Sequence, residues 1–482
     1  MESSASSACQ TDQASAVDDI PLAAPGQNPE KDPENGDGSK NAKAISFFHP
    51  TLKDTRIRAY RLWAVTVLAL GVFIIAVLSL YWGVLYAVYD RLPNITVWIV
   101  DFDAKTAPYD TITPIIGPFI TKEFSQLKPA LVDNLGWTIK PANEFDNDPM
   151  RVRQGVYYEK AHAAIIINSN ATALLKAAVN QGNSSYDPTG AAQVIYNTAR
   201  DQTTLTTYIL PALLDTLFPI LSHFGAQWAS MLDRNSSTQN VFRTPQAVNP
   251  AIGFSFIDLR PFNPPTATPS ISIGLIYLII ISFFSFSFLM PIHGLFIQPR
   301  GHPPVRTWHL FTWRIFSSIM AYFFLALCYS LISLAFQIPF SNNPAPTNVG
   351  AMNPNAYGKG SFVVYWMLNF VGMGALGLPC ENMAMILGQP YSSLWLILWV
   401  ITNVATSFYT LDLASDFYHW GRAWPLNRIV NGSRTILFDT RSTIGIDFGV
   451  LFAWVAVSII IFPFADYIMK WRLSRQVKQD KK

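Results

Sequence analysis

Long apolar runs, rather than apolar residues at a fixed spacing, dominate the pattern of hydrophobic and polar positions along the chain. Runs of about 18 or more residues with few charges are typical of transmembrane helices. Backbone amides in lipid must be paired within the segment, so these runs are predicted to be helical. The predicted transmembrane helices cover residues 61–90, 271–297, 315–338, 362–387, 393–411 and 449–468.

The region between the first two runs, residues 91–270, has the pattern of a folded α/β domain. Strand-like stretches occur in turn with helix-like stretches, and this alternation predicts a layered sheet. Strands are predicted within 94–102, 136–141, 161–170 and 191–197, and helices within 111–136, 171–182 and 203–235. Gly182 is expected to end the second of these helices. Residues 244–270 contain six prolines and are predicted to be an irregular linker.

Basic residues and glycosylation motifs predict one orientation. Lys and Arg residues concentrate before the first span, between the second and third spans, and after the sixth, and basic loops favour the cytosolic side. The Asn-X-Ser/Thr motifs are Asn94, Asn170, Asn183, Asn235 and Asn431. All of these candidate glycosylation sites fall on the other side of a six-span arrangement, where N-glycosylation takes place. The α/β domain is therefore predicted to be extracytoplasmic and both termini cytosolic.

The two ends of the chain are predicted to be cytosolic tails. Residues 1–60 are rich in Ser, Ala, Asp, Pro and Gly, so they cannot bury enough apolar surface to fold and are predicted to be disordered. Residues 470–482 form a short basic tail. The predicted fold class is an α-helical polytopic membrane protein with six transmembrane helices and an extracytoplasmic α/β domain between helices one and two.

Composition and charge agree with this class. The chain has 50% hydrophobic and 13% charged residues, against about 25% charged in an average soluble domain. A net charge of +3 is too small to indicate nucleic-acid binding. The cysteines are Cys9, Cys328 and Cys380, and none lies within 91–270, so the α/β domain has no disulfide framework.

Residues 416–438 form an unusual segment between the last two spans, within the five-helix region 271–469. Pro425 is suited to start a helix. From there Leu426, Ile429, Val430, Ser433 and Leu437 share one face, and Asn427, Arg428, Asn431 and Arg434 share the other. We predict a helix, a break and a second helix at the outer interface, with Trp at headgroup level and Arg422, Arg428 and Arg434 snorkelling. An anchoring role and a role as gate or substrate contact both remain open.

Polar side chains inside the spans are candidate functional groups. Glu381 is the acid that we single out, because an unpaired charge in a membrane is costly. It lies toward the cytosolic end of its span, and a kink at Pro379 is expected to admit water. Asn369 and Asn403 are predicted to form hydrogen bonds between helices. A structural role is the alternative for each of these residues.

Several stretches carry a resemblance to known families. The strand "VWIVDFD", the stretch "YYEKAHAAIIINSNATALL" and the strand "AAQVIYNTARDQ" resemble parts of the phage-infection-protein family and of type-2 ABC exporter permeases with a large outside domain. The stretch "DFYHWGRAWPLNRIVNGSRTILFDTRSTIGIDFGVLFAW" is similar to the fungal nitrosoguanidine-resistance family of membrane proteins. The resemblance covers about residues 60–470. It implies a role in drug or stress resistance at a fungal membrane, most simply the plasma membrane.

The exporter resemblance also implies partners. In such permeases the connection between spans two and three carries a helix that contacts an ATPase. Here that connection contains Arg306, Trp308 and His309, and a plain interfacial helix is the alternative. The chain has no phosphate-binding G-x4-G-K-[ST] loop, so an ATPase would have to be a separate chain. A homodimer and a regulatory protein are the other expected partners, besides the lipid bilayer.

The remaining motifs argue against an enzyme. The sequence has no H-E-x-x-H, no G-x-S-x-G and no Cys/His cluster with metal-ligand spacing, so neither a catalytic site nor a cofactor is predicted. Two functions remain. The first is a permease-like protein that exports or redistributes lipid-like or xenobiotic compounds. The second is a non-transporting organiser or regulator of membrane lipids or stress signalling, built on a permease-derived fold.

Overall fold

The computed structural model describes residues 46–127, 134–232, 238–297, 303, 305–340, 357–388 and 390–480. Residues 1–45 of the predicted disordered tail lie outside the described residues, and so does Asn235. The chain divides into two units, residues 1–68 and 69–482. In the first unit, the described residues form the short helix η1 (Pro50–Leu52) and the beginning of α1 (Lys53–Val84), which continues into the second unit.

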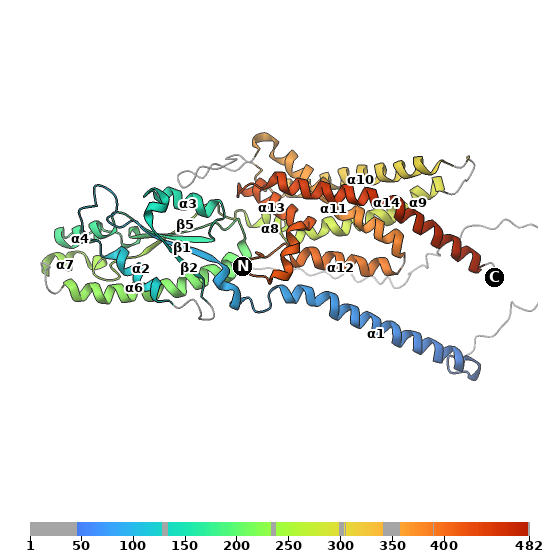
Figure 1. Cartoon of the computed structure of the whole chain (residues 1–482), viewed down its shortest axis with the longest axis horizontal. Helices are drawn as coiled ribbons and strands as arrows, with labels where there is room; N and C mark the ends of the chain where they lie inside the picture. The colour runs from blue at the N-terminus through green and yellow to red at the C-terminus, as the bar shows by residue number, and fades with distance from the viewer. Residues whose placement is uncertain are drawn as a thin grey trace, which may run out of the picture. The chain divides into compact units, whose positions relative to one another are not determined.

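A five-stranded sheet forms the centre of the α/β region in the second unit (Figure 1). Its strands, in chain order, are β1 (Thr96–Asp101), β2 (Gly136–Lys140), β3 (Ala163–Ile167), β4 (Ala192–Tyr196) and β5 (Phe254–Asp258). The spatial order is β2-β1-β3-β4-β5. All neighbouring pairs are parallel except β3 and β4, which are antiparallel. In the register, Val97 lies opposite Ala163, and Ala192 lies opposite both Ile167 and Phe254.

Helices cover both faces of this sheet (Figure 1). The helices of this region are α2 (Ile116–Gln126), α3 (Pro149–Tyr157), α4 (Ala171–Gln181), α5 (Gln202–Thr204), the π-helical turn η5 (Leu205–Ile209), α6 (Leu210–Leu232) and α7 (Thr238–Arg243). Val97 and Ile99 point to the face that α2, α4 and α6 cover. Trp98 and Val100 point to the face that α3 covers. Successive side chains of a strand alternate between faces, so a continuous apolar strand is buried on both sides.

One buried carboxylate connects the end of β1 to two helices. The Asp103 side chain is fully buried and accepts hydrogen bonds from the backbone N–H of Gly117 at 3.0 Å and of Thr172 at 3.0 Å. These amides belong to the first turns of α2 and α4, where N–H groups have no partner within the helix and a negative charge is favoured. Asp103 therefore stabilises the packing of both helices on the sheet.

The sequence predicted most of this α/β region correctly. Each predicted strand corresponds to one of β1 to β4, and Gly182 ends α4 in the left-handed conformation with φ of 68°. The linker prediction for 244–270 was wrong in one respect, because it contains β5. The prolines flank this edge strand and do not interrupt it, so β5 can pair with β4 along one side.

Six helices in the described part of the chain are long and apolar enough to cross a membrane. They cover Pro50–Val84, Gln202–Leu232, Pro265–Phe296, Thr307–Ala335, Ser361–Leu387 and Ile444–Arg472. The helices of the second half are α8 (Thr268–Ile271), α9 (Ile276–Ile297), α10 (Thr307–Ala335), α11 (Ser361–Leu387), α12 (Tyr391–Ala405), α13 (Pro425–Phe438) and α14 (Ile444–Asp480). The short 3-10 helices there are η7 (Pro265–Ala267), η8 (Ile273–Leu275), η9 (Gly358–Gly360) and η10 (Asp416–Ala423).

The structure differs from the predicted spans at two helices. The span predicted over 393–411 is helical only as α12, which has 15 residues. Conversely, residues 202–232 satisfy the length and hydropathy of a span but pack against the sheet, where Leu213, Leu217 and Phe224 are buried. Hydropathy alone cannot distinguish an apolar helix that faces lipid from one that covers a sheet.

Helix α11 is the central helix of the bundle. It packs against α9, α10, α12, α13 and α14, and most of its side chains are buried. A Cβ at Gly377 would lie 2.5 Å from Tyr322 Oη and 2.7 Å from Ser282 Cβ. A Cβ at Gly372 would lie 2.6 Å from Ile429 Cδ1. These glycines permit the close helix approach that small residues give to membrane bundles.

Candidate functional site

The segment 416–438 has the predicted break between two helices. The first helix is η10, Trp424 has extended backbone angles, and α13 begins at Pro425. The break is held by contacts with α12, since Asn403 Oδ1 accepts a hydrogen bond from Leu426 N at 3.1 Å. The Trp424 ring packs on Trp454 with 5.5 Å between ring centroids. These contacts fix the start of α13 against the bundle.

Helix α13 also has the two predicted faces. The apolar face is buried: it comprises Leu426, Ile429, Val430, Ser433 and Leu437. It packs against α8, α11, α12 and α14. The polar face, with Asn427, Arg428, Asn431 and Arg434, lines a cavity of about 350 Å³. An amphipathic helix at the edge of the bundle thus presents its cations to one partly open cavity.

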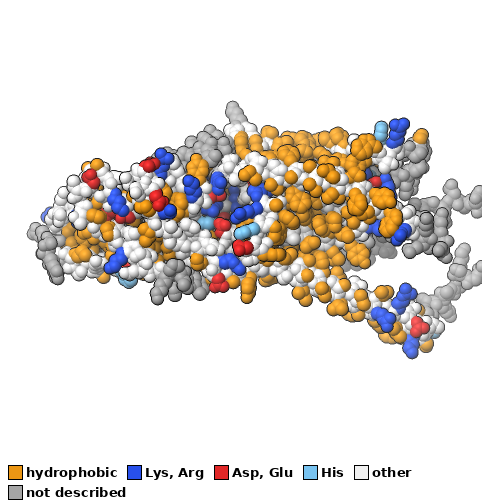
Figure 2. Space-filling view, in the orientation of Figure 1, with side chains coloured by type: hydrophobic (Ala, Val, Ile, Leu, Met, Phe, Trp, Pro, Cys, Tyr) orange, Lys and Arg blue, Asp and Glu red, His pale blue; other side chains and the backbone are white. Residues whose placement is uncertain are grey.

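This arginine-lined cavity lies between the α/β region and the helical bundle. Its charged lining comprises Arg200, Arg422, Arg428, Arg434 and Arg441 together with Glu159, Asp201 and Asp412. The acids and Arg200 come from loops after α3, β4 and α12, whereas the other arginines come from η10, α13 and the residues after α13. Figure 2 shows basic, acidic and histidine side chains gathered between the two regions. Five guanidinium groups face three carboxylates, so the cavity has an excess of positive charge.

Ion pairs hold several of these arginines in place. Arg434 Nη2 lies 3.9 Å from Asp201 Oδ1, and Arg441 Nη1 lies 3.6 Å from Glu159 Oε2. Arg428 donates to the carbonyl oxygen of Arg422, and its Nη1 lies 3.4 Å from Asp447 Oδ1. The distances for Arg434 and Arg441 are longer than a normal hydrogen bond. Both guanidinium groups therefore retain donors for another acceptor.

The side chain of Arg434 has a donor without a partner. Its Nε is buried and makes no hydrogen bond to the described residues. A buried donor left unsatisfied costs about 1–3 kcal/mol, and more when the group is charged. Burial lowers the pKa of Arg434, and the carboxylates of Asp201 and Glu159 oppose this shift. The Arg434 side chain lines the cavity, so an anion bound there would offset the cost of burying its charge.

A histidine contacts two residues of the cavity lining, Asp412 and Arg200. His162 Nε2 lies 3.3 Å from Asp412 Oδ2 and 3.2 Å from Arg200 Nη2. Burial, and then the charge of Arg200, lower the pKa of His162. The hydrogen bond from His162, followed by its charge and those of Arg200 and Arg422, lowers the pKa of Asp412. At neutral pH the pair is therefore a neutral imidazole beside a carboxylate, and His162 adds no positive charge.

The structure corrects the snorkelling prediction for two arginines. The side chains of Arg428 and Arg434 are only 14% and 13% exposed, and each lies against a carboxylate of the protein. Arg422 is exposed, as an anchoring residue would be, but it also lines the cavity. The sequence placed these cations on one helix face but could not reveal that Asp201, far earlier in the chain, faces Arg434, or that Asp447 faces Arg428.

The two predicted membrane asparagines bridge helices. Asn369 Nδ2 in α11 donates to Ser330 Oγ in α10 at 3.0 Å, as predicted. Asn403 in α12 bonds to α13 through its Oδ1, while its Nδ2 donates to Trp399 O of its own helix at 2.9 Å. Both side chains are fully buried. Their role in the structure is to connect neighbouring helices.

Glu381 belongs to a buried ion network that the sequence reading missed. Glu381 Oε1 lies 3.2 Å from Arg314 Nη2, and Arg314 Nη1 lies 3.0 Å from Asp466 Oδ1. Ser318 Oγ donates to Glu381 Oε2 at 3.1 Å. Glu381 is 1% exposed, so the prediction that a kink at Pro379 admits water to it was wrong. The sequence did offer signals of this network: Asp466 lies within the predicted span 449–468, and Arg314 lies at the edge of the predicted span 315–338.

The residues predicted to couple to an ATPase lie at the start of α10. Arg306 is the residue before the helix, and Trp308 and His309 belong to its first turn. They therefore do not form a separate interfacial helix. The Trp308 ring is exposed and stacks on Phe311 with 5.2 Å between centroids.

The candidate glycosylation sites differ in their surroundings. Asn183 is exposed in the loop after α4, and Asn170 is half-buried at the start of α4. Asn94 is exposed, and its Nδ2 donates to Asp412 O at 3.2 Å. Asn431 lines the arginine-lined cavity, and its Nδ2 donates to Asn427 Oδ1 at 3.2 Å. The sequon pattern cannot make this distinction, because it says nothing of burial.

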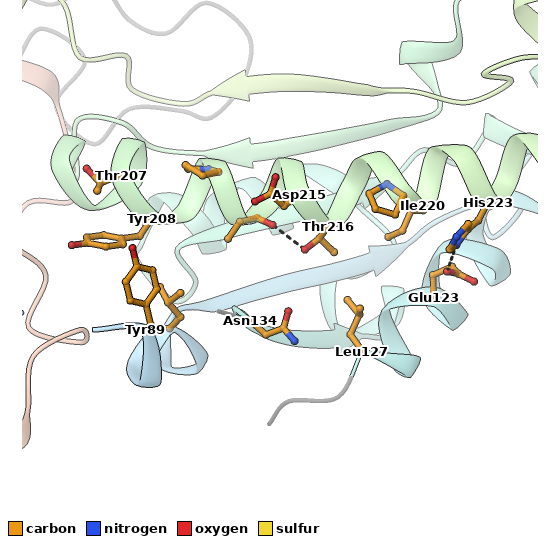
Figure 3. Close-up of a pocket in the computed structure, with 14 residues that line it drawn as sticks. Tyr89, Glu123, Leu127, Asn134, Thr207, Tyr208, Asp215, Thr216, Ile220 and His223 are labelled. Atoms are coloured by element: carbon orange, nitrogen blue, oxygen red, sulfur yellow. Dashed lines mark hydrogen bonds and ion pairs between the residues drawn. The ribbon is translucent and has the colours of Figure 1, made fainter. Parts of the chain in front are cut away.

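A larger cavity, of about 630 Å³, lies along α6 (Figure 3). The Tyr89 and Tyr208 rings meet edge to face at one end, with centroids 6.1 Å apart. His223 Nδ1 lies 3.2 Å from Glu123 Oε2 at the other end. None of the described residues that line this cavity is an arginine or a lysine, so it is less suited to an anion than the arginine-lined cavity. Among the described residues, no group of His, Cys, Asp or Glu side chains could hold a metal ion.

The comparisons with known proteins support a membrane protein. Residues 66–460 match the family described as a protein of unknown function, DUF3533. Because the match covers most of the chain, the protein belongs to this family. It is also 28% identical over 480 residues to a Saccharomyces cerevisiae protein named uncharacterized endoplasmic reticulum membrane protein YJR015W, covering 93% of this chain and 88% of the relative. No solved structure matches the chain at a significant level.

Replacing Arg314 with Ala should destabilise the bundle strongly. The substitution leaves the buried Glu381 without its cation, and breaking a buried pair in this way typically costs about 3–5 kcal/mol. We expect Arg314→Ala to lower the unfolding temperature of the purified protein in detergent, and Arg314→Lys to lower it less. Arg58→Ala, which removes an exposed arginine, is the control. Equal unfolding temperatures for Arg314→Ala and Arg58→Ala would disprove a stabilising role of the network.

Proposed function

We propose that this multi-pass membrane protein binds an anionic, lipid-like ligand in the arginine-lined cavity and acts as an organiser or regulator of membrane lipids. The observation that carries the proposal is the excess of guanidinium groups over carboxylates, together with the unsatisfied Nε of Arg434. Guanidinium groups bind phosphate and carboxylate oxygens in bidentate geometry and are less strongly hydrated than ammonium groups. The chemical class that fits best is a phosphate-bearing headgroup.

The packing of the bundle favours binding without transport. The central residues of α11, including Met373, Leu376 and Leu378, are fully buried among neighbouring helices. The buried network of Arg314, Glu381 and Asp466 ties α10, α11 and α14 together. A ligand bound beside α13 therefore meets a tightly packed core. In this role the protein would change stress or drug sensitivity through the distribution of membrane lipids.

The second candidate is the permease-like exporter of lipid-like or xenobiotic compounds. The resemblance to nitrosoguanidine-resistance proteins and to type-2 exporter permeases favours it. An exporter of this kind takes its energy from a separate ATPase, and the exposed Trp308 in the first turn of α10 is the proposed contact. A homodimer belongs to the same proposal. Neither candidate requires an enzymatic activity or a cofactor of this chain.

We place the α/β region and the arginine-lined cavity outside the cytosol, with both termini inside. This arrangement takes α12 as the fifth crossing. Its 15 residues reach roughly 22 Å at 1.5 Å per residue, less than a hydrocarbon core of about 30 Å. The non-helical residues 406–411 continue it; 406, 407 and 411 are buried and 408–410 are half-buried in protein, where irregular backbone is tolerated. The name of the yeast relative favours the endoplasmic reticulum over the plasma membrane expected from the sequence.

Removing the arginines of the cavity should weaken anion binding. The measurement is calorimetric titration of the purified full chain, in neutral detergent, with dihexanoyl phosphatidic acid. Hydrogen bonds to charged groups contribute about 1.5–3 kcal/mol, so Arg434→Ala should raise the Kd on the order of 10- to 100-fold. Arg434→Lys should bind with intermediate affinity, because an ammonium supplies the charge without the planar fork.

The control for this titration is Arg151→Ala. Arg151 is an exposed arginine of α3 that lies 3.7 Å from Asp146, away from the cavity. Its removal should leave the Kd unchanged. Dihexanoylglycerol, which lacks the phosphate, should not bind measurably. An unchanged Kd for Arg434→Ala, or equal affinity for the two lipids, would refute the proposed site.

The organiser and the permease differ in whether the protein moves a lipid across the bilayer. In vesicles that contain the purified protein and a fluorescent phosphatidic acid, dithionite quenches only the outer leaflet. We expect the same slow exchange between leaflets as in protein-free vesicles, with or without added ATP. Faster exchange in the wild type, and not in Arg434→Ala, would contradict the organiser and support the permease.

Glycosylation should distinguish the exposed motif from the enclosed one. In cells, Asn183→Gln should reduce the gel shift that peptide N-glycosidase F produces, because Asn183 is exposed in the proposed lumenal region. Asn431→Gln should leave the shift unchanged, because the Asn431 amide lies in the cavity wall. A wild-type protein without any such shift would count against the proposed orientation.

A further inference from the structure

An apolar groove lies between the start of α9 and the end of α10, apart from the arginine-lined cavity. Its volume is about 440 Å³. Its walls include Tyr277 and Ile281 of α9 and Tyr329, Ile332 and Phe336 of α10. None of the described residues that line it carries a charge.

The position of the groove determines what covers it. Helices α9 and α10 are both long and apolar enough to span a membrane. Tyr277, Ile332 and Phe336 are exposed on their outer surface, where such helices contact lipid. The groove begins beside Ser270 in α8, just before the span of α9, and so at the end of the span. Its occupant is therefore a membrane lipid with one end near the membrane surface.

A chain of buried hydroxyl groups forms the polar part of the groove. Ser270 Oγ lies 3.0 Å from Ser333 Oγ, which lies 3.3 Å from Tyr365 Oη. All three side chains are nearly or fully buried. Three hydroxyl groups carry three protons, and these two hydrogen bonds use two of them. One O–H at an end of the chain has no acceptor among the described residues, which is unfavourable in apolar surroundings.

We infer that the apolar groove binds an uncharged lipid with one hydroxyl group on a rigid apolar body, which is the chemistry of a sterol. A hydroxyl oxygen beside Ser270 accepts the proton that the protein leaves unpaired. The absence of charge from the lining disfavours a phosphate headgroup, because burying an unpaired charge is costly. The aromatic rings of Tyr277, Tyr329 and Phe336 offer flat apolar surface for a rigid ring system. This inference does not depend on the arginine-lined cavity.

The test is photo-crosslinking of the full chain in phosphatidylcholine nanodiscs. The probe is a sterol with a diazirine on its ring system and a free hydroxyl group, and mass spectrometry maps the labelled peptides. We expect labelling of α9 and α10 at the groove, with competition by unlabelled sterol. Ile332→Trp should fill the groove and Ser270→Ala should remove the donor, and each should reduce labelling on the order of tenfold. Leu334→Trp makes a similar increase in side-chain size at an exposed α10 residue outside the groove, and it should leave labelling unchanged.

Three results would overturn the inference. Equal labelling by a deoxysterol probe, which has no oxygen to accept the hydrogen bond, would show that the hydroxyl is not recognised. Labelling by a diazirine phosphatidylcholine that sterol does not displace would show ordinary boundary lipid at the groove. An equal loss of labelling in Leu334→Trp and Ile332→Trp would show that the bulky residue acts on α10 as a whole.

Discussion

A buried ion pair between Arg260 and Asp439 connects the two halves of the second unit. Arg260 follows β5, and Asp439 ends α13 in the left-handed conformation. Arg260 Nε donates to Asp439 O at 3.1 Å, and its Nη2 donates to Asp439 Oδ2 at 3.1 Å. The guanidinium also lies over the Tyr157 ring, 4.8 Å from the centroid. A buried charge without a partner is strongly unfavourable, so these contacts to the backbone and to the carboxylate of Asp439 fix the sheet relative to α13 and thereby position the arginines of the cavity.

In the helical bundle, other side chains fix the elements relative to one another. Helix α11 meets its neighbours through glycines, which allow backbones to approach, and through buried polar side chains, which must find partners there. Arg314 satisfies two carboxylates from two helices, and Asn369 reaches a serine of α10. Each partner restricts how the helices can rotate or slide. The outcome is a rigid frame on which α13 and the apolar groove are built.

The sequence predicted the features that depend on local pattern. Strand alternation, the glycine that ends α4, the proline that starts α13 and the two faces of α13 all follow from a few neighbouring residues. What it could not predict depends on contacts between distant residues. Asp201 opposite Arg434, Arg314 opposite Glu381 and the hydroxyl chain at Ser333 each bring together residues of different elements. Hydropathy likewise failed to predict whether α6 and α12 span the membrane. It measures apolar character, and not whether a helix contacts lipid or other parts of the protein.

The two candidate sites complement each other chemically across α8. Helix α13 packs against α8, and Ser270 of α8 lines the apolar groove. One side of this contact presents excess guanidinium groups, and the other presents uncharged aromatic and hydroxyl groups. A change in the packing of α8 would alter both surfaces together. Helix α8 contributes Ser270 to the groove, and it packs against α13, which carries arginines of the cavity. The groove and the cavity are therefore built on two helices, α8 and α13, that pack against each other.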